Sequence, residues 1–307
     1  MSAGDRQVVI VTGAGRGLGR AHALEFADRG AAVVVNDLGA SLDGTGHEPG
    51  PAEQVAEEVR ARGGLALVNG DDISEPEGAQ RLLAATLDAF GKVDVLVNNA
   101  GIMRDRTLVN MTIEEWDAVI KVHLRGTFAP MSAVAKHWRE LSKSGQEVDG
   151  RIINTTSSSG IYGNPGQGNY GAAKAGIASL TIIASRELAR YGITVNAIAP
   201  AALTRMTEGL RTDRPEIPEG QFDPGAPENV SPLVAWLASP AAAGVTGRVF
   251  NIRGGHVSVA EGWIAGPGVE EERRLTVEDL DGILPDLIAQ ARPNAVMNGK
   301  VPQEAAR

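Results

Sequence analysis

Residues 8–19 read Val-Val-Ile-Val-Thr-Gly-Ala-Gly-Arg-Gly-Leu-Gly, and this stretch decides the fold. Four β-branched apolar residues predict a buried strand, and the pattern of helical period that begins at Gly17 predicts a helix directly after the turn. A strand, a glycine-rich turn and a helix together bind the pyrophosphate of a dinucleotide, because the phosphates lie at the positive end of the helix. The stretch therefore predicts a dinucleotide-binding turn.

The same alternation of strands and helices continues along the chain. Short apolar runs that alternate with helical segments indicate a parallel sheet covered on both faces. We expect a Rossmann-like, doubly wound α/β domain with a seven-stranded parallel sheet over residues 1–256, and a C-terminal extension over 257–307. The strands are expected at 8–11, 32–36, 66–69, 93–98, 151–155, 194–198 and 249–252. The helices are expected at 17–29, 51–62, 77–90, 113–142, 169–191 and 227–238, with one more at 276–291 in the extension.

Composition excludes several classes of function. A formal charge of −9 argues against a nucleic-acid partner, since phosphate binding needs a basic surface. The chain has no cysteine, which excludes disulfides, thiolate metal sites and a cysteine nucleophile, and we predict no metal site. No run of about 18 apolar residues predicts a membrane span, and the polar N-terminus has no signal-peptide core, so we expect a cytoplasmic protein.

Acidic residues at strand ends indicate which dinucleotide binds. Asp37 follows the second predicted strand, where a carboxylate accepts hydrogen bonds from the adenosine ribose and repels a 2′-phosphate. No Arg or Lys occurs between Val33 and Glu58, so NAD is expected rather than NADP; the alternative is an ordinary turn acid. Asp72 and Ile73 follow the third strand and are expected beside the adenine, although acids are common at strand ends.

Further cofactor contacts are expected at the same sheet edge. Asn98-Asn99-Ala100-Gly101 ends the fourth strand; small residues let the chain pass close to the cofactor, and the Asn amides can tie neighbouring strands. Taken alone, this stretch also fits a simple turn. The residues expected to bind NAD, apart from those implied by the resemblance below, are Gly13, Arg16, Gly17, Leu18, Gly19, Asp37, Asp72, Ile73, Asn99, Ala100, Gly101, Tyr170 and Lys174.

Tyr170 and Lys174 are the candidate catalytic pair. Four residues apart on a predicted helix, they lie on one face, one turn apart. A nearby ammonium favours the phenolate and is expected to lower the pKa of the tyrosine from its usual value near 10. Ser157, at the end of the fifth strand, can hydrogen-bond a substrate oxygen. The three groups suffice for proton transfer coupled to hydride transfer between an alcohol and a nicotinamide.

The chain resembles the short-chain dehydrogenase/reductase family over about residues 5–256. The motifs that carry the resemblance are Thr12-Gly-x-x-x-Gly17-x-Gly19, Asn98-Asn-Ala-Gly101, Ser157, Tyr170-x-x-x-Lys174 and Asn196-x-x-x-Pro200. The resemblance implies an NAD-dependent oxidoreductase with Ser157, Tyr170 and Lys174 in catalysis. It also implies cofactor contacts from Pro200 and Thr204, and assembly as a homodimer or homotetramer.

One position departs from the family pattern. Lys121-Val-His-Leu-Arg-Gly126 places His123 where the family usually has the Asn of a Ser–Tyr–Lys–Asn tetrad. Imidazole can hold a water or relay a proton, so His123 is a further catalytic candidate; a histidine bonded only to a backbone carbonyl is the alternative.

The departure narrows the resemblance to one subgroup, the (3R)-hydroxyacyl-CoA dehydrogenase units of peroxisomal D-specific multifunctional enzymes, which are also 17β-hydroxysteroid dehydrogenases. It rests on Asn36-Asp-Leu-Gly39, Arg62-Gly-Gly64, Arg104-Asp-Arg106, Val122-His-Leu-Arg-Gly126 and Gly160-Ile-Tyr-Gly-Asn164. By this resemblance the substrate is a (3R)-3-hydroxyacyl-CoA, and the extension lies at the substrate site or at an oligomer interface.

The sequence leaves alternatives open for the substrate and for the function. A hydroxysteroid or a steroid side-chain CoA ester keeps the same chemistry, and a non-catalytic NAD-binding module is the alternative from another class. Apolar candidates for the substrate pocket, each equally compatible with core packing, are Met103, Tyr162, Leu203, Met206 and Trp263. Cationic candidates for the CoA phosphates, each also compatible with a solvated surface charge, are Arg104, Arg106 and Arg205.

Overall fold

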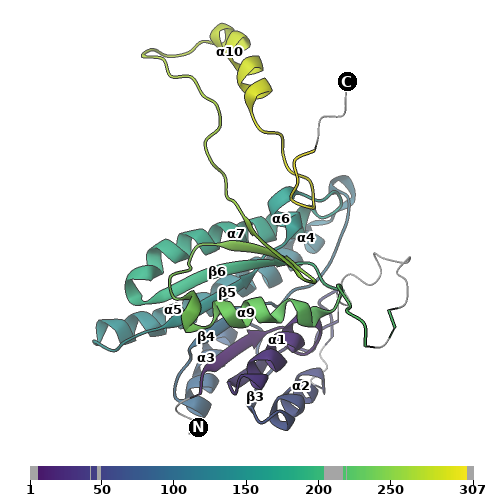
Figure 1. The fold of residues 1–307 in the computed structure, drawn as a ribbon, viewed down its shortest axis with the longest axis vertical. Coiled ribbons are helices and arrows are strands. Elements are labelled where there is room, and N and C mark those ends of the chain that lie inside the picture. Colours follow the sequence, from purple (N-terminus) through teal and green to yellow (C-terminus); the bar gives the residue numbers. More distant parts are fainter. Residues whose placement is uncertain (1–5, 42, 47–49, 204–216, 219, 303–307) are drawn as a thin grey trace.

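Eight strands form one sheet in the order β3-β2-β1-β4-β5-β6-β7-β8, as Figure 1 shows. The computed structural model describes residues 6–41, 43–46, 50–203, 217–218 and 220–302. The strands are β1 (Val8–Thr12), β2 (Ala32–Asn36), β3 (Leu65–Asn69), β4 (Val95–Asn98), β5 (Gly150–Thr155), β6 (Ile193–Pro200), β7 (Val249–Arg253) and β8 (His256–Ala260). All neighbouring pairs are parallel except β7 and β8, which are antiparallel.

Helices cover both faces of this sheet. The α-helices described are α1 (Gly17–Asp28), α2 (Gly50–Ala61), α3 (Pro76–Phe90), α4 (Ile113–Ile120), α5 (Gly126–Lys143), α6 (Ser158–Tyr162), α7 (Gly168–Leu188), α9 (Ser231–Leu237) and α10 (Val277–Gln290). Short 3₁₀ turns are η2 (Leu108–Asn110), η4 (Ala189–Tyr191), η5 (Pro227–Asn229) and η6 (Pro240–Ala242), and η3 (Lys121–Arg125) is a π-helical turn.

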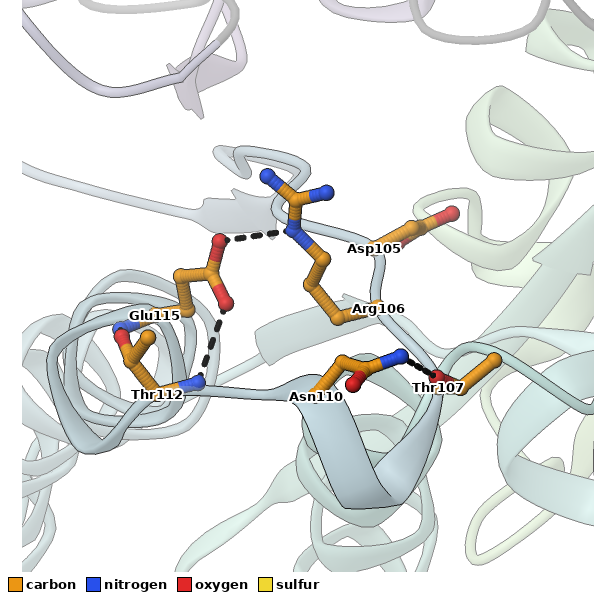
Figure 2. Close-up of a pocket in the computed structure, with 6 residues that line it drawn as sticks. All are labelled: Asp105, Arg106, Thr107, Asn110, Thr112 and Glu115. Carbon is orange, nitrogen blue, oxygen red and sulfur yellow. Dashed lines mark hydrogen bonds and ion pairs between the residues drawn. The ribbon is translucent and has the colours of Figure 1, made fainter.

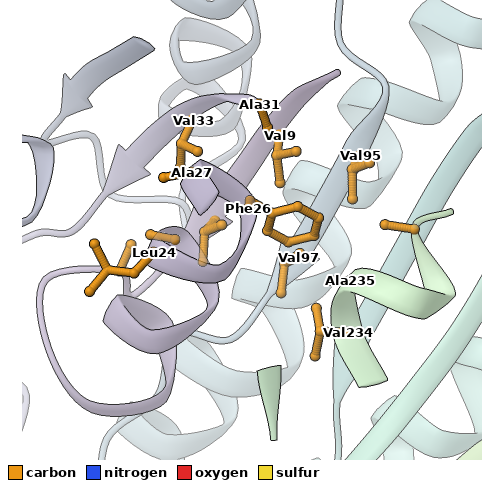
Figure 3. Close-up of a cluster of buried hydrophobic side chains, with 14 of the residues drawn as sticks. Val9, Leu24, Phe26, Ala27, Ala31, Val33, Val95, Val97, Val234 and Ala235 are labelled. Atoms are coloured by element: carbon orange, nitrogen blue, oxygen red, sulfur yellow. The ribbon is translucent and has the colours of Figure 1, made fainter. Parts of the chain in front are cut away.

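Alternating side chains of the strands divide the core into two layers. Val9 and Val11 of β1 pack against α1 and α9, where Phe26 lies among the strand valines (Figure 3). Ile10, between them, points to the opposite face and joins Trp138 of α5. Because successive residues of a strand face opposite sides, a central strand buried on both faces must be apolar throughout. Each fully buried side chain of this kind contributes roughly 1.5–3 kcal/mol.

The Rossmann-like doubly wound fold is confirmed, with three differences in its elements. The sheet has eight strands rather than seven, because the chain reverses at Gly254-Gly255 and adds β8 antiparallel to β7. The helix expected over 113–142 is interrupted, since η3 inserts a wider turn between α4 and α5. The short helix α6 was not expected.

The C-terminal extension leaves the body of the molecule after β8. In Figure 1 α10 stands apart from the sheet, and none of its residues is buried. A capping box between Thr276 and Asp279 begins this helix. The chain then returns to the body, where Gly299 lies against the ring of Tyr162. Within the described residues, no helix combines the length and apolar character needed to cross a bilayer.

Candidate active site

A cavity of about 1020 Å³ opens at the carboxyl edge of the sheet. It lies between the ends of the neighbouring strands β1 and β4. After β1 the next strand is added on one side of this pair, and after β4 the next strand is added on the other side. In open α/β sheets, such a reversal of strand order leaves a crevice that binds ligands. The cavity is lined by the glycine turn after β1 and by the segments that follow the neighbouring strands.

The glycine turn after β1 brings the backbone close to the cavity without side chains in between. Gly13 and Gly17 have positive φ angles of 63° and 53°, which favour glycine. A Cβ at Gly13 would lie 2.7 Å from the Cα of Ala100, and a Cβ at Gly19 would overlap the carbonyl oxygen of Gly13. Gly13, Arg16, Gly17 and Leu18 line the cavity, whereas Gly19 serves the close packing of α1 on the turn. The cradle fits a pyrophosphate at the start of α1.

Asp37 lies directly beside this turn. Its Oδ2 accepts a hydrogen bond from the backbone N of Gly15 at 2.9 Å, and its Oδ1 accepts one from Gly39 at 2.7 Å. A Cβ at Gly15 would meet the same carboxylate. The carboxylate lines the cavity next to the turn, which is where an adenosine ribose would lie.

Further cofactor candidates lie beyond the ends of β3 and β4. Asp72 and Ile73 line the cavity after β3, with Asp72 Oδ1 accepting from the hydroxyl of Ser74 at 2.6 Å. Asn99 Nδ2 donates to the carbonyl oxygens of Thr12 and Gly13, both at 3.1 Å. The amide thus ties the end of β4 to the glycine turn, as expected.

Other expected contacts have mixed outcomes. Ala100, Gly101 and Pro200 line the same cavity. Thr204, Arg205 and Met206 lie outside the described residues.

Ser157, Tyr170 and Lys174 converge on one end of the cavity. Ser157 caps α6, with its Oγ accepting from the backbone N of Ser159 at 3.1 Å. Lys174 is 3% exposed, and its Nζ donates to the carbonyl oxygen of Thr155 at 2.6 Å. The same Nζ lies 5.6 Å from the centre of the Tyr170 ring. The arrangement presents a hydroxyl, a phenol and an amine to one small volume.

Burial controls the proton affinities of the pair on α7. It raises the pKa of Tyr170, while the hydrogen-bonding contribution of Ser157 lowers it and the negative charge of Asp105 raises it. Burial also lowers the pKa of Lys174 to about 7. The net direction for Tyr170 is opposite to the lowering expected from Lys174, because burial is the largest influence on the phenol and the Lys174 Nζ lies 5.6 Å from the ring centre.

His123 lies beside this group, on the π-helical turn. The ring is 2% exposed and meets the Tyr170 ring edge-on, with 5.1 Å between ring centres. Its Nε2 lies 2.7 Å from the carbonyl oxygen of Ile102 and 3.1 Å from the backbone N of the same residue. Nδ1 is buried without a hydrogen-bond partner. Burial, followed by the charge of Lys174, lowers the pKa of His123 to about 3, so the ring is neutral at physiological pH.

Some of the residues expected to contact the substrate line the cavity, and others do not. Met103, Arg104 and Leu203 line the cavity. Trp263 does not line it, and its side chain is 94% exposed on the segment after β8, so Trp263 is neither a pocket residue nor a core residue in this structure.

Arg106 lies at a different place. It lines a separate hollow of about 470 Å³ on the outside of the segment that follows β4 (Figure 2). Its Nε donates to Glu115 Oε1 at 3.1 Å, so the guanidinium is held there by an ion pair.

Sequence reasoning missed several residues of the cavity wall. Asn164 and Gln167 line the wall next to Tyr170, and Met297 reaches it from the extension. Only Gln167 carries a signal in the sequence, since it is an amide three residues before Tyr170, at the residue that precedes α7. A lone glutamine is nevertheless compatible with any helix start.

The chain is similar to known oxidoreductases. The family described as short chain dehydrogenase matches residues 7–215. "Hydroxyacyl-CoA dehydrogenase ChsB1" of Mycobacterium tuberculosis is 47% identical over 259 residues, which are 82% of this chain and 79% of that protein. "Peroxisomal multifunctional enzyme type 2" of Mus musculus is 44% identical over 260 residues, 85% of this chain and 32% of that protein. A crystal structure of a short chain dehydrogenase from Mycobacterium avium is 52% identical, with a TM-score of 0.84 over 94% of this chain and 97% of that chain.

Proposed function

Because the chain belongs to the short-chain dehydrogenase family, we propose that it interconverts a (3R)-3-hydroxyacyl-CoA and its 3-oxoacyl-CoA with NAD. The protein is an oxidoreductase that acts on a CH–OH group. The observation that carries the proposal is the convergence of Ser157, Tyr170 and Lys174 on one end of a cavity whose other end is the glycine turn.

The side chains of the site have separate tasks in this reaction. Tyr170 exchanges a proton with the substrate oxygen, and its raised pKa suits donation during reduction of the ketone. Ser157 donates a hydrogen bond to the same oxygen and so orients it. Lys174, which lines the same cavity, would hydrogen-bond the nicotinamide ribose. A nicotinamide dinucleotide supplies or accepts the hydride when bound.

Asp37 supports NAD as the dinucleotide, within a family that binds NAD or NADP. Its carboxylate lines the cavity beside the glycine turn, where a 2′-phosphate would meet a negative charge. We propose that Asp72 and Ile73 flank the adenine, since both line the cavity on the neighbouring strand end.

The acyl-CoA substrate is supported by the names of the relatives and by the cavity wall. Met103, Leu203 and Met297 supply apolar surface for an acyl chain, and Arg104 supplies a cation near its rim. A hydroxysteroid, or a steroid with a CoA-bearing side chain, is the second candidate, because the same apolar wall accepts a ring system. A non-catalytic NAD-binding module would not need the Ser–Tyr–Lys group.

We also propose a role for the C-terminal extension, which was expected over residues 257–307 and leaves the sheet after β8. Met297 lines the cavity, which supports a place at the substrate site. Val277 and Ile288 of α10 are each 71% exposed, which supports a contact with another subunit of a homodimer or homotetramer. Sizing chromatography with light scattering tests the assembly, and a monomer would contradict it. A cytoplasmic location stays a prediction.

The decisive experiment is NADH formation with (3R)- and (3S)-3-hydroxyacyl-CoA of several chain lengths, beside a 17β-hydroxysteroid. We expect turnover of the (3R) thioesters. Turnover of the steroid alone would favour the second candidate, and no reaction with any thioester would contradict the leading proposal.

A further inference from the structure

Gln167 lies between the two segments that carry Ser157 and Tyr170. Its side chain is 8% exposed, at the residue that precedes α7. Its Oε1 accepts hydrogen bonds from Ser159 Oγ at 2.7 Å and from Asn164 Nδ2 at 2.9 Å. The first of these bonds reaches the turn in which the backbone N of Ser159 donates to Ser157 Oγ. Gln167 therefore links the serine turn to the helix that carries the tyrosine.

Asp105 fixes the orientation of this amide. Gln167 Nε2 donates to Asp105 Oδ2 at 2.7 Å, across 62 residues of chain. An amide that donates on one side must accept on the other, so this bond commits Oε1 to Ser159 and Asn164. In Figure 2 the Asp105 carboxylate is turned away from Arg106, whose Nε is bonded to Glu115. Among the described residues, no cation pairs with Asp105.

One backbone bridge and one side-chain hydrogen bond strengthen the same junction. Arg106 and Gln167 form an isolated parallel bridge. Asn169, the residue before Tyr170, donates from Nδ2 to the carbonyl oxygen of Arg104 at 2.9 Å. The segment after β4 is thus attached to the first turn of α7 on both sides of the helix start.

We propose that Gln167 is a positioning residue, oriented by Asp105, that holds Ser157 and Tyr170 at the separation needed to bond one substrate oxygen together. The inference rests on the proposed oxidoreductase chemistry at Tyr170. Two groups that act on one atom lose their benefit when either is displaced, and a displacement of about 1 Å can cost as much as 100-fold in rate. Gln167 touches neither substrate nor cofactor in this role; it acts through Ser157.

A double-mutant cycle tests this role. Gln167→Ala is expected to lower kcat about tenfold, with little change in the Kd for NADH, because only the placement of Ser157 changes. In a Ser157→Ala background, Gln167→Ala is expected to lower kcat by less than about twofold, since the Ser157 hydroxyl that it positions is already absent. Gln146→Ala, which removes an exposed glutamine, is the matched control. Equal costs in both backgrounds, or wild-type kcat for Gln167→Ala, would overturn the proposal.

A second measurement needs no substrate, so it separates this inference from the proposed function. The measurement is the pH titration of the tyrosine rings, followed by carbon-13 NMR. The chain has three tyrosines, and the signal that disappears in Tyr170→Phe belongs to Tyr170. The groups that face Tyr170 among the described residues are Lys174, His123 and Asp105. Because Ser157 lowers the pKa of the phenol, Gln167→Ala should raise the titration midpoint as Ser157→Ala does. A midpoint unchanged in Gln167→Ala but raised in Ser157→Ala would overturn the proposal.

Variants of Asp105 test the same proposal without changing the buried side chain of Gln167. Asp105→Ala frees the amide to turn over, and we expect the same pattern at smaller size: a lower kcat that disappears in the Ser157→Ala background. Asp105→Asn keeps an acceptor for Gln167 Nε2 and should restore most of the kcat. Equal losses in the Ala and Asn variants would contradict the orienting role.

Discussion

The imidazole of His123 fills the space that the missing side chain of Gly101 leaves. A Cβ at residue 101 would overlap the ring carbon Cε1 and lie 3.0 Å from Nδ1 and 3.1 Å from Nε2. The same ring is bonded through Nε2 to the backbone of Ile102. The two residues therefore fix, as a pair, how the chain after β4 passes the catalytic end of the cavity.

Gly101→Ala should destabilise the protein by about 1–3 kcal/mol, because the added methyl group has no room beside a buried ring. Urea unfolding measures this free energy. His123→Asn substitutes a smaller side chain and should reduce the cost of the alanine in the double variant. The same cost in both backgrounds would show that the clash is relieved elsewhere.

Tyr170→Phe should lower kcat by about 100-fold to 10,000-fold, since the phenol is the proton donor and acceptor of the proposed reaction. The Kd for NADH, measured by fluorescence, should stay near that of the wild type. Retained turnover would contradict the mechanism.

Asp37→Ala should reduce the preference for NAD over NADP by about tenfold to a hundredfold, the range expected for losing a hydrogen bond to a charged group. The measurement is kcat/KM with each dinucleotide. Asp88→Asn, an exposed change on α3, serves as the control. Selectivity equal to that of the control would refute the role of Asp37.

Acid should destabilise the protein through two buried histidines. Burial lowers the pKa of His22 and of His123 from 6.5 to about 3. Between these pH values the unfolded chain binds protons that the folded chain excludes, so stability falls as the pH drops below 6.5. Each histidine contributes at most about 1.4 kcal/mol per pH unit.

Urea unfolding between pH 7 and pH 5 checks this prediction. His123→Gln should flatten the pH dependence, whereas His256→Gln, which replaces an exposed histidine, should leave it unchanged. Parallel curves for all three proteins would mean that His123 is not kept neutral by burial.

Local motifs allowed much of this molecule to be predicted from sequence. The glycine turn, Asp37 and the Tyr170–Lys174 pair each depend on spacing within one strand, turn or helix. The central strands were also accessible, because burial on both faces demands continuous apolar runs such as Val8–Val11.

Features that depend on contacts across the chain could not be predicted. β8 was not predicted, because an antiparallel edge strand does not need a continuous run of apolar residues. Its Val257 and Val259 are about half exposed. Gln167 and Asp105 are hydrogen-bonded although they lie 62 residues apart in the chain, and the residues around each of them give no sign of this contact. The wide turn at η3 was hidden because helical periodicity continues on both sides of it.

That wide turn makes the catalytic end of the cavity sensitive to the number of residues as well as to their identity. A π-helical turn holds one more residue than an α-helical turn, and such turns arise by single-residue insertion into a helix. Removing one residue from Lys121–Arg125 would turn everything before it by about 100° relative to α5. A length change of one residue would thus move His123 away from Ile102, whereas an exchange of the side chain at residue 123 leaves the number of residues in the turn unchanged.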